Sequence, residues 1–167
     1  MNDQQDPMAR NKALAREHLR LIWQASQMGG ELNNEDRRTA EVMREHPEHT
    51  HLWDRLDQLT DAEITADGTN PILHIILHTT VENQIARGDP LEAGQVVNAL
   101  ARRGLSRHEA VHRVAEVLSG EIWRVLSEKR PSDPGRYAAK LAKLLRSGAT
   151  PSTRTRAKRR SHPQRRR

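Results

Sequence analysis

Apolar residues recur at intervals of three and four positions along most of the chain, which is typical of amphipathic α-helices. No segment keeps the strict alternation of apolar and polar residues that a half-buried strand requires. The sequence therefore predicts an all-α fold. We expect a single bundle-like domain of about six helices over residues 8–147, with residues 1–7 disordered.

Capping residues, glycines and prolines mark the expected helix ends. Asn70-Pro71 and Ser106 are typical helix starts, and Gly104 is a typical stop. The stretch TDAEITADGTN, residues 60–70, is predicted to be a loop because it contains the turn signal Asp-Gly. The main helices are expected at about 8–28, 34–46, 71–87, 90–104, 106–129 and 136–145, with a shorter piece at about 51–59.

Two of these helices carry the same pattern, His-x3-His-x3-Glu. The residues are His74, His78 and Glu82 in the first helix, and His108, His112 and Glu116 in the second. At about 100° of rotation per residue, the second histidine of each set lies about 40° from the first, and the glutamate about 80° from it. Both sets fall on the apolar side of their helix, the second among Ile122, Trp123 and Leu126. We therefore expect the histidines to face the core, with each glutamate at the edge of that face.

Buried imidazoles and carboxylates need hydrogen-bond partners or a metal ion, because burying them without either is unfavourable. Histidines at i and i+4 converge on one ion, and side chains from a facing helix complete its shell. The sequence predicts such a site, with the two glutamates as ligands or outer partners: His74, His78, His108, His112, Glu82 and Glu116. It would hold one or two divalent transition-metal ions, Zn, Fe or Mn. The alternative is a structural hydrogen-bond network, and the sequence leaves open whether the protein is an enzyme.

Residues 108–112, HEAVH, also match the HExxH spacing of zinc peptidases. However, Glu109 lies three positions after Ser106, and this spacing is typical of a capping box that closes the helix start. No strand is expected nearby to bind an extended peptide, so we interpret Glu109 as a structural residue and disfavour a peptidase.

A third group of histidines lies near a helix break, in HPEHTH, residues 46–51. His46, His49 and His51 are interpreted as parts of a polar surface turn. The alternative is that one of them adds a ligand or an outer partner to the metal site. The chain contains no cysteine, so thiolate ligands and disulfides are excluded.

The basic character of the chain comes from its C-terminal end. Residues 151–167 hold eight Lys and Arg and no acid, which leaves 20 basic and 22 acidic side chains in the first 150 residues. Such a segment has too little apolar surface to fold alone, so residues 148–167 are predicted to be a disordered tail. Non-specific contact with RNA or DNA is one expected role of residues 151–167, and a solubilising terminus is the alternative. The second function hypothesis is accordingly a non-enzymatic interaction module with structural histidines.

Targeting signals are not evident in the sequence. The N-terminus MNDQQDPMARNK has no apolar run, and no stretch of 18 apolar residues occurs. The expectation is a cytoplasmic protein without a membrane span.

Three segments also resemble a known family. NPILHIILHTTVENQIARGDP from Asn70, GLSRHEAVHRVAEVL with the following EIW, and HPE at 46–48 are similar to the bacterial family catalogued as domain of unknown function 1841. Its members share an NP-x-LH-x-x-LH start and a later H-x3-H. The resemblance implies a small, mainly helical cytoplasmic protein without an assigned activity.

Overall fold

The computed structural model describes residues 7–66 and 68–147. Within these residues the chain forms eight α-helices, one short 3-10 helix and no strand, which confirms the all-α prediction. The elements are α1 (Pro7–Gln27), α2 (Asn34–Arg44), η1 (Pro47–His49), α3 (Thr50–Trp53), α4 (Asp61–Ile64), α5 (Pro71–Arg87), α6 (Leu91–Arg102), α7 (Arg107–Glu128) and α8 (Pro134–Arg146). The predicted basic tail and its nucleic-acid contact lie outside the described residues.

The helix count exceeds the predicted number of about six because two short helices, α3 and α4, occur in addition to six longer ones. The segment expected to be a loop contains α4, so that prediction is wrong. Thr60 and Glu63 form a capping box at its start: the Thr60 Oγ1 accepts the Glu63 N–H at 3.3 Å, and the Glu63 carboxylate accepts the Thr60 N–H at 2.8 Å. The same spacing at Ser106 and Glu109 starts α7. The signal for α4 was therefore present in the sequence.

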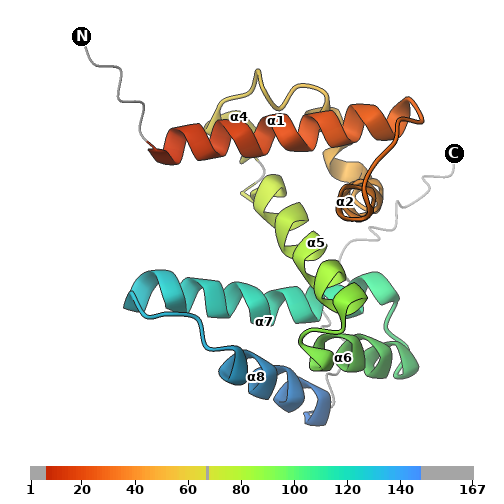
Figure 1. Cartoon of the computed structure of the whole chain (residues 1–167), viewed down its shortest axis with the longest axis vertical. Coiled ribbons are helices and arrows are strands. Elements are labelled where there is room, and N and C mark those ends of the chain that lie inside the picture. The colour runs from red at the N-terminus through yellow and green to blue at the C-terminus, as the bar shows by residue number, and fades with distance from the viewer. Residues whose placement is uncertain (1–6, 67, 148–167) are drawn as a thin grey trace, which may run out of the picture.

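Helix α5 connects two layers of helices (Figure 1). It runs from the layer that contains α1 and α2 to the layer formed by α6, α7 and α8. Its N-terminus is capped by the Asn70 side chain, which accepts the Leu73 N–H at 3.1 Å, and Pro71 occupies the first turn. Its C-terminus ends at Gly88, whose φ of 66° is a left-handed conformation that glycine adopts without strain.

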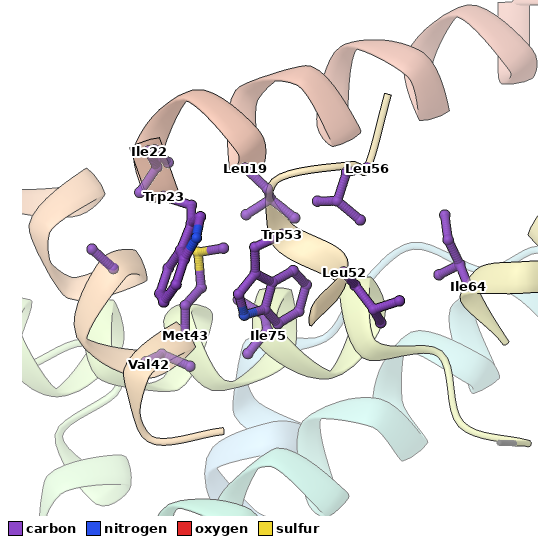
Figure 2. Close-up of a cluster of buried hydrophobic side chains, with 11 residues drawn as sticks. Leu19, Ile22, Trp23, Val42, Met43, Leu52, Trp53, Leu56, Ile64 and Ile75 are labelled. Carbon is purple, nitrogen blue, oxygen red and sulfur yellow. The ribbon is translucent and has the colours of Figure 1, made fainter. Parts of the chain in front are cut away.

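The first layer encloses an N-terminal core built around two tryptophans (Figure 2). Trp53 is fully buried, and Trp23 is 6% exposed. The core consists of Leu19, Ile22, Trp23, Ala40, Val42, Met43, Leu52, Trp53, Leu56, Ile64 and Ile75. Only the last of these comes from α5.

The second layer encloses a separate C-terminal core of smaller side chains. Its members are Val81, Ala93, Val96, Val97, Leu100, Ala110, Val111, Val114, Ala115, Tyr137 and Leu141. Helix α5 contributes Ile75 to the N-terminal core and Val81 to the C-terminal core. The turn of α5 between these two residues carries His78, so that histidine lies where the two cores meet.

The C-terminal half of α7 differs from the prediction. Ile122, Trp123 and Leu126 were expected to face inward, but they are 41%, 71% and 69% exposed. Helix α8 packs on the other side of α7, where Glu121 is 7% exposed and accepts the Arg136 Nε–H at 3.3 Å. The buried face of α7 therefore changes along its length. None of the described helices is both long and apolar enough to cross a bilayer.

Candidate metal centre

His46 is brought into the interior by the break after α2. Helix α2 ends at Arg44, and Pro47 starts the 3-10 helix η1, so the chain turns at His46 with a φ of −120° and a ψ of 66°. The side chain is 1% exposed. Its Nδ1 lies 2.8 Å from the Val42 carbonyl oxygen. Because a carbonyl oxygen only accepts, Nδ1 carries the proton, and the Nε2 of the neutral ring has a free lone pair.

Helix α5 contributes His78 and His74, one turn apart. His78 is 1% exposed, and neither of its ring nitrogens has a hydrogen-bond partner among the described residues. Burial, followed by the nearby His112, lowers the pKa of His78 to about 2. The His74 Nε2 lies 2.7 Å from the His46 Nε2. This part of α5 thus places two imidazoles against the one from the α2 break.

Helix α7 contributes His108 and His112, also one turn apart. Their Nε2 atoms are 3.0 Å apart. The His108 Nδ1 lies 3.1 Å from a carboxylate oxygen of Glu45, the residue that follows α2. An ionised carboxylate accepts, so Nδ1 of His108 donates, and its Nε2 points toward the other histidines with a lone pair.

Four of these histidines form a compact set. One ring nitrogen from each lies within 4.8 Å of the others, in the group His46, His78, His108 and His112. A tetrahedral zinc site with ordinary Zn–N bonds separates its nitrogens by about 3.4 Å. The nitrogens are therefore grouped on the scale of a zinc site, since none of their separations exceeds 4.8 Å and the His108 and His112 Nε2 atoms are 3.0 Å apart. His74 lies directly beside this set, with its ring centroid 4.9 Å from that of His112.

The two predicted glutamates lie outside the four-histidine group. Both carboxylate oxygens of Glu82 are bound by the Arg107 guanidinium, at 2.6 Å for the Nη2 contact. The Glu116 side chain is 66% exposed and pairs with Arg113 at 3.3 Å. Neither glutamate belongs to the four-histidine group, and both are engaged by arginines.

His46 belongs to the four-histidine group but is absent from the predicted ligand set, where it appears only as part of an alternative. It was assigned to a polar surface turn, and for His46 that interpretation is wrong, because the residue is buried among other histidines. His51 is exposed, as a surface turn implies. The useful signal was the His-Pro pair, since a proline forces the preceding residue out of the helix and changes the direction of its side chain.

Glu109 forms the predicted capping box with Ser106, is exposed and does not belong to the four-histidine group. Its carboxylate accepts the Ser106 N–H at 2.9 Å, and the Ser106 Oγ accepts the Glu109 N–H at 3.2 Å. We expect Glu109→Ala to lower the free energy of unfolding modestly, because it removes one half of the capping box, and to leave metal affinity unchanged. Urea denaturation and a cobalt titration measure the two effects. A large loss of metal affinity at unchanged stability would contradict the structural role.

The histidine cluster makes the stability of the metal-free protein dependent on pH. Burial lowers the pKa of His46 and His112 below 6.5 and, together with the charge of His46, lowers that of His74 to about 4. As the pH falls below 6.5, the unfolded chain takes up protons before the folded chain does. Stability is therefore fully present above about pH 6.5 and decreases progressively toward about pH 4.

We accordingly expect the unfolding temperature of the metal-free protein to be lower at about pH 5 than at about pH 7.5. Calorimetry in the presence of a chelator measures this difference. His78→Leu removes one buried imidazole and should reduce the dependence. A stability that is constant or increases toward acid would show that the imidazoles are not held neutral by burial.

The fold and the site together define an all-α protein with a histidine cluster between two hydrophobic cores. The profile of the family described as Domain of unknown function (DUF1841) matches residues 11–143. The chain belongs to this family, which confirms the resemblance seen in its histidine motifs. A search of curated proteins and a search of solved structures each find no match. The family description assigns no activity, so the function has to be inferred from the site.

Proposed function

We propose that this protein binds one divalent transition-metal ion through His46, His78, His108 and His112. The observation that carries the proposal is the state of His78. Its two ring nitrogens are buried without a hydrogen-bond partner among the described residues, and four other imidazoles surround it. An unsatisfied buried polar group is unfavourable, and a metal ion supplies the partner that the protein does not.

The surroundings of His46 and His108 support the same proposal. Each ring donates its Nδ1–H to an oxygen outside the cluster, the Val42 carbonyl in one case and the Glu45 carboxylate in the other. These contacts fix the tautomer that leaves Nε2 free. Metal-binding histidines have such outer partners almost always, because they orient the ring and increase its basicity.

A purely structural hydrogen-bond network accounts for only part of the cluster. His74 can donate to His46 and His112 can donate to His108, which satisfies the two close Nε2 pairs. His78 has no place in this scheme. His78 is fully buried at the junction of the two cores, and a metal ion is therefore the better explanation for its position.

The donor set also limits the choice of metal. Four neutral imidazoles suit Zn, Fe, Ni or Cu, whereas Mn prefers oxygen ligands. The predicted carboxylate ligands Glu82 and Glu116 are paired with arginines, which favours Zn or Fe over Mn among the metals expected from the sequence. Within the described residues one group of three or more ligand side chains is close enough to hold an ion, and this favours one ion over two.

A cobalt titration of untagged, metal-free protein tests the proposal, because Co²⁺ bound by histidines absorbs visible light. We expect saturation at one equivalent, and a loss of affinity of at least about 100-fold in His46→Ala, since even an outer partner contributes 10–100-fold. His51→Ala is the matched control, because His51 lies five residues further along the chain, in α3, and is exposed. Equal affinity of His46→Ala and the wild type would contradict the proposed ligand set.

A further inference from the structure

A cleft between α5 and α7 leads from the surface to the histidine cluster. It has a volume of about 280 Å³, and its inner wall includes His78 and His112, two members of the four-histidine group. His74 lines the same cleft, and Glu116 and Ser119 of α7 lie along it. A small molecule in this cleft contacts the proposed ligand set directly.

His74 belongs to the histidine cluster but is not one of the four proposed metal ligands. Its Nε2 is 2.7 Å from the His46 Nε2. Since the proton of His46 is on Nδ1, His74 has to be the donor in this pair. When His46 uses its Nε2 lone pair to bind an ion, the acceptor of the His74 N–H is lost.

The cleft is where His74 can regain an acceptor. His74 lines the cleft together with two proposed ligands, so an acceptor atom bound there can contact the ion and the His74 N–H at once. Zinc is mostly four-coordinate in proteins but sometimes expands to five-coordinate, so an ion held by four imidazoles can take one further ligand. The cleft is slightly smaller than ordinary ligand pockets, which start at about 300 Å³. Its size accommodates a small molecule.

We propose that this cleft is a binding site for a small anion or neutral molecule that ligates the ion and accepts a hydrogen bond from His74. This inference rests on the proposed metal site and extends it, because it makes the ion accessible to exogenous ligands. His74 acts in it as a positioning residue. Glu116, which lines the cleft, pairs with Arg113 at 3.3 Å, and this pair offsets its negative charge.

Azide binding to the cobalt-loaded, untagged full chain tests the inference. Azide is small, anionic and a good ligand of Co²⁺, and its coordination shifts the visible absorption. We expect a saturable shift in the wild type. In His74→Ala, cobalt should still bind at one equivalent, but azide affinity should decrease by about tenfold, the effect of one lost hydrogen bond.

Two tryptophan substitutions on α7 provide a test that does not involve a histidine. Ser119→Trp fills the cleft and should weaken azide binding by more than about tenfold. Ser127→Trp, on the exposed surface two turns further along the same helix, is the matched control and should have no effect.

The outcomes separate the two proposals. If cobalt does not bind, the proposed metal site fails, and this inference fails with it. If cobalt binds and azide leaves the spectrum unchanged, the metal site stands and the inference is overturned. Loss of cobalt binding in His74→Ala would make His74 a ligand and would overturn its role as a donor to the exogenous molecule.

Discussion

Replacing His78 with leucine is expected to abolish metal binding and to stabilise the metal-free protein. The loss of metal binding and the gain in stability have one common cause, which is that the ring nitrogens of His78 are available to an ion but have no partner without it. His78 is 1% exposed, and its two ring nitrogens have no partner among the described residues. Each unsatisfied buried polar atom destabilises the fold by about 1–3 kcal/mol. Leucine has a similar volume and leaves no polar atom unpaired, so it should recover part of this energy.

A cobalt titration measures the loss of metal binding, and calorimetry with a chelator measures the stability of the metal-free protein. His18→Leu is the control, because the His18 side chain is 64% exposed and lies on α1. It should change neither quantity. A His78→Leu variant that is less stable than the metal-free wild type would show that the imidazole has a structural role, as the hydrogen-bond alternative requires.

Saturating zinc is expected to increase the free energy of unfolding of the wild type by about 4 kcal/mol at a concentration 1,000 times the Kd. The ion would join three segments that belong to different parts of the fold. His46 follows α2 of the N-terminal core, His108 and His112 belong to α7 of the C-terminal core, and His78 lies on α5 between them. Unfolding either layer therefore breaks the site.

The expected shift in unfolding temperature is about 8–16 °C for a domain of this size. Differential scanning calorimetry with and without zinc measures it, and a chelator should reverse it. His78→Leu should show no shift, which excludes a general effect of zinc on surface histidines. A zinc effect of equal size in this variant would contradict the account.

The secondary structure was largely predictable because its signals are local. Asn70-Pro71 and Gly88 are caps whose effect depends on a few neighbouring residues, and they delimit α5 at Pro71–Arg87 as the sequence predicts. The direction of His78 also followed from local periodicity. The loop prediction for residues 60–70 rests on the turn signal Asp67-Gly68 and does not take account of the capping box at Thr60 and Glu63, which starts α4.

The composition of the site was less predictable, because it depends on which elements pack together. His46 is 28 residues from His74 in the chain, and no periodicity relates a helix break to a distant helix face. Glu82 and Glu116 lie at the edge of the predicted faces, about 80° from the first histidine of each helix. At such an edge a carboxylate reaches solvent or an arginine more readily than the interior, and both glutamates pair with arginines.

The arrangement of the two cores explains why polar side chains are tolerated at the centre of the molecule. The N-terminal core ends at Ile75 on α5, and the C-terminal core begins at Val81. The imidazoles occupy the space between them, where apolar packing is interrupted. An ion at this junction would hold the layers together in a chain whose apolar content is only 35%.

The most direct test is the metal content of the protein. Untagged protein would be incubated with zinc and iron, dialysed extensively, and analysed by inductively coupled plasma mass spectrometry. The account predicts one equivalent of a transition metal per chain in the wild type and none in His78→Leu. A wild-type protein that retains no metal after this treatment would contradict it.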